Sequence, residues 1–258
     1  MNITAILPWK VKCANVYLTT VLSLIQDKMF FILVYLKTNP LQELHAIQFE
    51  MTQPQANRWI HLLSEILRRT LKTLGELPDR NSKRLIHILQ GCEEVLLDGT
   101  ERPIQRPLDE HAIVVKKTHS IKNNLLCTNN LRIVWLSSTY KGHVHDKKIC
   151  DEEPLLLPKG IRLWQDTGFI GHKPDGVEIC MPKKKPKGKE LTCVEKQENK
   201  RISGVRIKVE HAIGGMKKCR IVKERFRCHK FGFEDMVILI ACGLHNFRIS
   251  HKMSHITN

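Results

Sequence analysis

The sequence predicts an α/β protein in two parts: an all-α domain over residues 1–90 and a mixed core over residues 91–250, followed by a tail, 251–258. Two observations support this prediction. Apolar residues recur at helical spacing through the first part, whereas short runs rich in Val, Ile and Leu begin near residue 93. Helical patterns return after these runs, and such a mixture packs as an α/β or α+β core.

The composition is that of a globular protein with a strong positive charge. The 258 residues include 42 Lys and Arg against 26 Asp and Glu, a net charge of +16. This charge favours a polyanionic partner, either nucleic acid or an anionic membrane surface. The apolar runs are far shorter than the ~20 residues of a membrane-spanning helix, so we expect no membrane insertion. Nine cysteines without a C-x-x-C pair favour a reducing cytoplasm over a disulfide framework.

Three helices are expected in the first part. Residues 27–39 are apolar and end at Asn39-Pro40, which stops one helix and starts another over residues 40–51. Thr52 has the position of an N-cap, with Gln55 at the second position of a capping box. A longer helix then runs toward residue 75. Its predicted inward face consists of Ala56, Trp59, Ile60, Leu63, Ile66, Leu67 and Leu71.

A short helix, a tight turn and a longer helix form the plan of a helix-turn-helix unit. In that interpretation the second helix offers polar side chains to a DNA groove, namely Gln53, Gln55, Asn57 and Arg58. An ordinary helical hairpin has the same pattern, because helix-turn-helix units lack a unique sequence code.

Strands are expected from residue 93 onward. Residues 93–98, 119–129 and 131–140 are predicted to form a three-strand meander, followed by a short helix near residues 145–153. A further strand over residues 160–166 precedes a basic loop, 172–200. A long helical stretch over residues 195–222 and a buried helix over residues 233–250 complete the core.

Acidic residues at the ends of these elements are the candidates for catalysis. Asp98 and Asp166 each end an apolar strand before a Gly-containing turn, and neighbouring strands would bring their carboxylates to one edge. Two close carboxylates resist ionisation unless a cation lies between them, and oxygen ligands suit Mg²⁺. Glu210 shares a helical face with Arg206 and Lys217, which predicts either a metal ligand flanked by phosphate-binding cations or a solvated salt bridge.

Two further features carry charge. Asp146 begins the short helix, where it is either a turn or cap residue or a fourth acid of the site. The loop 172–200 is rich in lysine, and we expect it to track DNA because each cation can neutralise a phosphate. Its lysines are Lys183, Lys184, Lys185, Lys187 and Lys189. A solvated loop and a nuclear-localisation string are the alternatives.

Six strings occur in order along the chain: VLLDGTERPIQRP, STYKGHVHDKKI, LWQDTGF, PKKKPKGKELT, RISGVRIKVEHAIGGMKKCRIV and ACGLHNFR. Together they resemble DDE-superfamily insertion-sequence transposases, in the branch that includes the Harbinger-like endonucleases. The segment before them resembles the helix-turn-helix of that family. The resemblance spans roughly residues 30–250. In the family's Y-x2-R-x3-E-x6-K signature, Arg206, Glu210 and Lys217 match, whereas Ser203 replaces the tyrosine.

The resemblance implies a ribonuclease H-like catalytic core behind the helix-turn-helix. Its catalytic acids would be Asp98, Asp166 and Glu210, which with Asp146 would bind Mg²⁺ or Mn²⁺. The implied activity is cleavage of DNA at the ends of a mobile element and strand transfer to a target. The implied partners are double-stranded DNA and further copies of the chain, in the cytoplasm at the nucleoid. The alternatives are a catalytically silent DNA-binding protein and a nuclease of the same fold that does not join strands.

Overall fold

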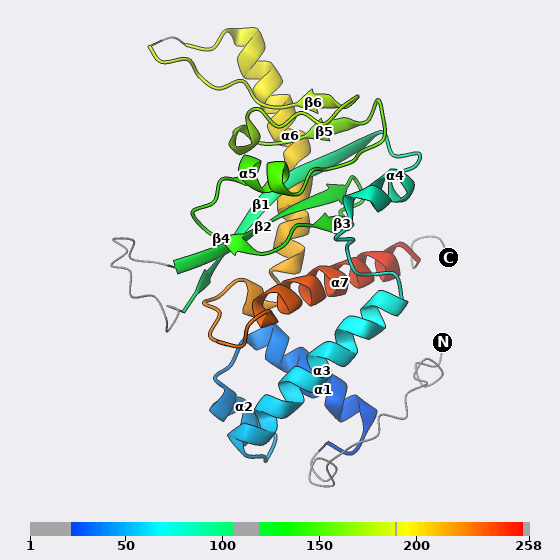
Figure 1. The fold of residues 1–258 in the computed structure, drawn as a ribbon, viewed down its shortest axis with the longest axis vertical. Helices are drawn as coiled ribbons and strands as arrows, with labels where there is room; N and C mark the ends of the chain where they lie inside the picture. Colours follow the sequence, from blue (N-terminus) through cyan, green and yellow to red (C-terminus); the bar gives the residue numbers. More distant parts are fainter. Residues whose placement is uncertain (1–21, 106–118, 189, 255–258) are drawn as a thin grey trace.

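The computed structural model describes residues 22–105, 119–188 and 190–254. In Figure 1 the N-terminal helices lie at one end of the molecule and the β-sheet at the other, with a long helix, α7, between them. The elements in chain order are α1 (Ile25–Thr38), α2 (Gln42–Gln48), α3 (Gln53–Thr73), α4 (Leu85–Ile88), β1 (Glu94–Ile104), β2 (His119–Thr128), β3 (Ile133–Leu136), β4 (Tyr140–Lys141), α5 (Asp146–Glu152), β5 (Arg162–Trp164), β6 (Glu178–Cys180), α6 (Cys193–Met216) and α7 (Phe233–Ser254).

The three N-terminal helices form where the sequence predicts them. Helix α3 begins with the expected capping box, in which the Thr52 N–H donates to Gln55 Oε1 at 2.9 Å. Asn39 ends α1 in the left-handed conformation, at φ 49°. The apolar face of α3 is buried as predicted, except that Ile66 is half-buried and Ser64 is buried in addition. Burial of each large aliphatic side chain contributes roughly 1.5–3 kcal/mol, which holds α3 in place.

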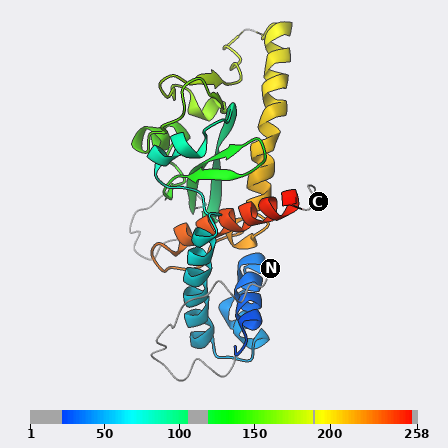
Figure 2. The same ribbon diagram turned by 90° about the vertical axis from the view of Figure 1, so that its right-hand side faces the viewer.

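The sheet has the strand order β3-β2-β1-β5-β6, and β4 also pairs with β2. Strands β1, β2 and β3 are antiparallel, as the predicted meander requires, whereas β5 and β6 run parallel to β1. Helices cover both faces. Figure 2 shows α6 running along one face of the sheet, and the buried residues of α4 and α5 pack against the other.

Alternating residues of β1 belong to two different cores. Leu96 packs with α6, α7 and the N-terminal helices, whereas Val95 and Leu97 pack with α4 and α5. This follows from the period of two in a strand, which sends successive side chains to opposite faces. The first core continues from the sheet through α7 into α1 and α3. The predicted domain boundary at residue 90 therefore crosses one continuous apolar core.

Several predicted boundaries are wrong. Strand β1 does not end at Asp98 but continues to Ile104, because residues 99–104 pair with β2. Helix α6 ends at Met216 rather than at residue 222, and a 3₁₀ turn, Arg220–Val222, follows. The segment 172–200 is a loop only in part, since it contains β6 and the first two turns of α6. The predicted tail begins at residue 251, whereas α7 extends to Ser254. Residues 255–258 lie outside the described residues.

Candidate active site

Two acidic side chains from adjacent parallel strands share one cation. Asp98 lies on β1, two residues beyond the last β1–β5 pair, Leu96 with Trp164, and Asp166 follows the end of β5 at the same edge. Arg206 of α6 lies between them, with Nη2 at 3.5 Å from Asp98 Oδ2 and Nη1 at 3.5 Å from Asp166 Oδ1. We call Asp98 and Asp166 the acid pair. The structure thus brings both carboxylates into contact with one guanidinium, at the sheet edge where the sequence predicts them.

Backbone N–H groups fix the direction of both carboxylates. Asp98 Oδ1 accepts a hydrogen bond from the Gly99 N–H at 2.8 Å. Asp166 is the N-cap of a 3₁₀ turn, Thr167–Phe169, and its Oδ1 accepts from the Thr167 N–H at 2.7 Å. Asp98 therefore uses Oδ1 for its local hydrogen bond and Oδ2 for the contact with Arg206, whereas Asp166 uses Oδ1 for both.

The environment of Asp98 disfavours its charged form. Burial raises the pKa of the Asp98 carboxyl, and the charges of Asp166 and Glu210 act in the same direction. The Arg206 guanidinium and the Gly99 N–H oppose this rise. The structure thus gathers more negative charge than one guanidinium balances, and a further cation would relieve the repulsion.

Glu210 of α6 and Lys217, the residue that follows the end of α6, are the other members of the face predicted from the sequence. Glu210 is exposed, one helical turn after Arg206, and its charge acts on Asp98. Lys217 is half-buried and its Nζ lies 3.4 Å from the Glu101 carbonyl oxygen. Burial lowers the pKa of Lys217, and the neighbouring Arg102 lowers it further. Within the chain as described, no group of three or more His, Cys, Asp or Glu side chains is close enough together to hold a metal.

Asp146 lies on the other face of β1. A Cβ on Gly99 would point away from the Asp98 side and would come within 2.9 Å of Asp146 Oδ1. Asp146 forms a salt bridge with Lys122 of β2 at 3.1 Å, and a Cβ on Gly168 would meet its Oδ2 at 3.3 Å. The predicted fourth acid is thus neutralised by its own lysine, separately from the acid pair. Sequence reasoning missed Lys122 because only the β1–β2 register brings it to this place.

The predicted groove-reading side chains lie at the start of α3, but three of them already form hydrogen bonds within the α2–α3 pair. Gln53 and Asn57 both donate to Gln42 Oε1, at 2.9 and 3.0 Å, and Gln55 caps the helix. Arg58 is exposed. The Gln42 contacts tie α2 to α3, so these amides would have to rotate or share their bonds to contact DNA.

The lysine-rich loop lies at the opposite end of the molecule from α2 (Figure 1). Lys183 pairs with Glu195 at 3.2 Å and Lys185 pairs with Glu190, whereas Lys184 and Lys187 are also exposed. Lys189 lies outside the described residues. Because glutamates neutralise Lys183 and Lys185, the better candidates for phosphate contacts are Lys184 and Lys187.

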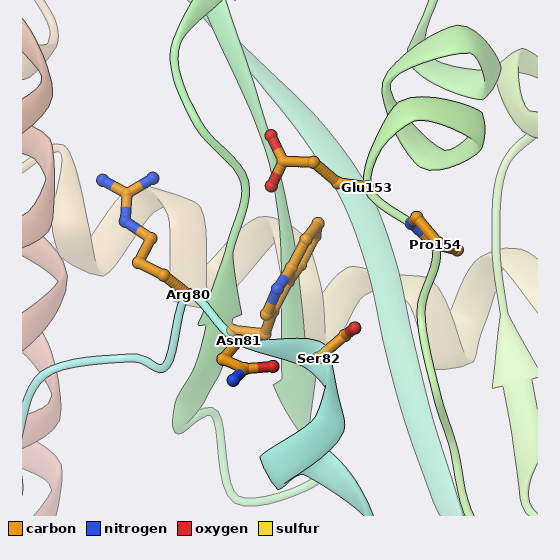
Figure 3. Close-up of a pocket in the computed structure, with 6 residues that line it drawn as sticks. Arg80, Asn81, Ser82, Glu153 and Pro154 are labelled. Carbon is orange, nitrogen blue, oxygen red and sulfur yellow. The ribbon is translucent and has the colours of Figure 1, made fainter.

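A surface pocket of ≈ 360 Å³ lies elsewhere, between the segment before α4 and the end of α5 (Figure 3). Its lining consists of Arg80, Asn81, Ser82, Trp135, Glu153 and Pro154. The charged groups have internal partners already, since Arg80 pairs with Asp235 at 2.7 Å and Glu153 accepts from the Ser138 N–H at 3.0 Å. The pocket contains no member of the acid pair and is not the candidate active site.

Among the helices of the described residues, none has both the length and the apolar character of a membrane span.

Comparisons with known proteins identify the family of both parts of the chain. Residues 97–246 match the model of a DDE superfamily endonuclease, and residues 21–73 match the helix-turn-helix of a DDE superfamily endonuclease. The second match decides against an ordinary helical hairpin. A probable transposase for insertion sequence element IS702 from Microchaete diplosiphon is 23% identical over 234 residues, which cover 89% of this chain and 82% of the relative. No solved structure matches. The chain therefore belongs to the DDE superfamily of endonucleases.

Proposed function

We propose that the protein is a transposase that cuts DNA at the ends of its element and joins those ends to target DNA. The observation that carries this proposal is the convergence of Asp98 and Asp166 on a single guanidinium. Membership of the DDE superfamily and the helix-turn-helix support DNA as the substrate. The motif strings favour the Harbinger-like branch, and the mixed sheet with α6 on one face is what a ribonuclease H-like core requires.

The donor set fits a hard divalent cation, Mg²⁺ or Mn²⁺. Both members of the acid pair offer carboxylate oxygens, and Arg206 shows that one positive charge can reach both. We propose Asp98 and Asp166 as the principal ligands, with Glu210 as the third acid. When bound, such cations activate an attacking oxygen and stabilise a leaving one in phosphodiester chemistry. Asp146 was expected to join them, and we propose instead that it orders the opposite face of the sheet through Lys122.

The remaining residues have roles that follow from their positions. Arg206 holds the two carboxylates together and balances part of their charge, so they stay aligned before DNA arrives. Lys217 and the exposed lysines of the loop neutralise phosphates, and Arg58 with its neighbours on α3 binds the element's ends. A chain that joins two ends must hold both, so we expect a dimer or larger assembly. Acting on such DNA would place it in the cytoplasm, at the nucleoid.

Cleavage of DNA that carries the element's ends tests the proposal. The wild-type chain should nick this DNA in the presence of Mg²⁺ and form a strand-transfer product with a second duplex. Asp98→Asn should abolish nicking and leave binding of the ends within about twofold, because the helix-turn-helix is untouched. Binding without nicking in the wild type would indicate a silent DNA-binding protein. Nicking without joining would indicate a nuclease, and nicking by Asp98→Asn would refute the assignment of the acid pair.

A further inference from the structure

The segment between α6 and α7, residues 217–232, is the most basic part of the described chain outside the lysine-rich loop. It carries seven Lys and Arg residues and a histidine against one acid, Glu224. Most of these side chains are exposed: Lys218, Lys223, Arg225, Arg227, His229 and Lys230. Lys218, Lys223 and Arg225 form no salt bridge with any acidic side chain that the structure describes. We call residues 217–232 the basic turn.

The backbone of the basic turn is held against the sheet. Phe226 forms a parallel bridge with Ile104 beyond the last β1–β5 pair, and its N–H donates to the Pro103 carbonyl at 2.9 Å. Phe226 is buried and Cys228 is half-buried, whereas Arg225 and Arg227 are exposed. This alternation is that of an extended strand with one face inward, so the cations share the outward face.

An apolar side chain further along the basic turn is also exposed. Phe231 is 98% exposed, although the aromatic rings on both sides of it in sequence, Phe226 and Phe233, are buried with centroids 6.1 Å apart. The Phe233 N–H donates to the Lys230 carbonyl at 3.2 Å, and Gly232 has φ +76°, where an L side chain would be strained. The turn is thus anchored on both sides while it presents one fully solvated ring.

The basic turn also contacts the helix-turn-helix. Asn39, at the end of α1, donates to Glu224 Oε2 at 3.4 Å and to the Arg225 carbonyl at 3.5 Å, and Arg227 donates to the Asn39 carbonyl. In Figure 1 the turn lies between the N-terminal helices and the sheet. DNA bound along this side would pass the basic turn on its way from α3 to the acid pair.

We propose that the basic turn is a second DNA-binding site and that Phe231 inserts between base pairs as a wedge. Its cations would bind the phosphates on either side of the inserted ring. Proteins that bend DNA use apolar wedges of this kind to unstack a base step, and every base offers a face on which an aromatic ring can stack. A protein that bound this exposed ring would have to be acidic, because the basic turn carries many cations. DNA, the substrate expected for the family, already supplies that negative charge. The inference rests on the proposed function, since it places the distortion of DNA near the cleavage site.

Fluorescence of 2-aminopurine tests the wedge. The probe is a duplex of the DNA that flanks the gene, with 2-aminopurine replacing successive adenines. Wild-type protein should raise the fluorescence at one step, because an unstacked 2-aminopurine is brighter than a stacked one. Phe231→Ala should abolish this rise and weaken binding about tenfold, and Phe231→Trp should retain both. The matched control is Val194→Ala, which removes another exposed apolar side chain, 74% exposed, from the start of α6.

The cations are tested by the salt dependence of binding. Arg225→Ala combined with Lys230→Ala should reduce the slope of log affinity against log salt by about 2, since each phosphate contact contributes about 0.9. An unchanged slope, or fluorescence and affinity of Phe231→Ala equal to those of the wild type, would overturn the proposal. So would conversion of a dimer into a monomer by Phe231→Ala with the fluorescence rise intact, which would assign the ring to a second copy. A fluorescence rise without Mg²⁺-dependent nicking would refute the transposase function and leave the wedge standing.

Discussion

The two faces of β1 carry acidic residues whose charges are balanced in different ways. On one face Asp98 and Asp166 share Arg206, so two carboxylates meet one guanidinium. On the other face Asp146 meets Lys122 alone, at 3.1 Å. Both arrangements lie at neighbouring positions of one strand, Asp98 and Gly99. A further cation would therefore stabilise the acid pair, which carries more negative charge than Arg206 balances. Asp146 and Lys122 balance each other and form a structural salt bridge.

The largest expected difference between the two faces of β1 is in the rate of DNA nicking. Asp166→Asn should lower the rate of DNA nicking at least a thousandfold, because a lost metal ligand removes several kcal/mol of transition-state stabilisation and each 1.36 kcal/mol is tenfold. Asp146→Asn should lower it less than tenfold. Single-turnover nicking at saturating Mg²⁺ measures both. Equal losses in the two variants, with both proteins folded by circular dichroism, would place Asp146 in the metal site and end the distinction.

The effect of Mg²⁺ on the free energy of unfolding should distinguish Arg206 from Lys122. Arg206→Ala leaves two carboxylates unbalanced, and Lys122→Met leaves one, so each should lower the free energy of unfolding in EDTA by about 1–3 kcal/mol. Mg²⁺ should restore most of the loss in Arg206→Ala, since it can take the place of the guanidinium charge. It should restore little in Lys122→Met. Urea unfolding with and without Mg²⁺ gives the comparison, and Mg²⁺ rescue of Lys122→Met would contradict it.

Removing the acidic charge itself should have opposite effects on the two faces. In EDTA, Asp98→Asn should raise the melting temperature at pH 7, because burial raises the pKa of Asp98 in the folded state and its ionised form is unfavourable there. A raised folded pKa means that the folded state binds more protons than the unfolded one. Stability is therefore lost as pH rises from the ordinary aspartate range through the folded pKa, and the advantage of Asp98→Asn should vanish at acidic pH.

On the other face, Asp146→Asn should lower the melting temperature at pH 7, because it leaves the half-buried Lys122 without its partner. Differential scanning calorimetry of both variants from pH 4 to 8 tests the pair of predictions. A melting temperature lowered by both substitutions would show that Arg206 overcompensates the acid pair.

Local sequence patterns predicted the start and buried face of α3 and the acid pair, but not the Asp146–Lys122 salt bridge. The capping box of Thr52 and Gln55 and the buried face of α3 depend on neighbours in sequence, and both were predicted correctly. The acid pair was also predicted, because strands that end together bring their side chains together. However, Asp98 lies within β1, and only the pairing of residues 99–104 with β2 extends that strand beyond it. The Asp146–Lys122 salt bridge depends on the same register, so the sequence left Asp146 as a candidate ligand.

The smallest expected effect comes from the glycine that separates the two faces. Gly99 has a φ that other residues adopt, but a Cβ there would lie 2.9 Å from Asp146 Oδ1 and 3.1 Å from its Cγ. The end of the aspartate side chain can shift, so Gly99→Ala should cost only about 1 kcal/mol of stability, mainly by stretching the Lys122 salt bridge. Gly168→Ala, at 3.3 Å from Oδ2, should cost less and is the matched control. Nicking should stay within about threefold of the wild type in both variants, because Asp98 points to the opposite face. A large loss of nicking in Gly99→Ala at unchanged stability would mean that the position of Asp146 matters to the acid pair, and that the two faces work as one site.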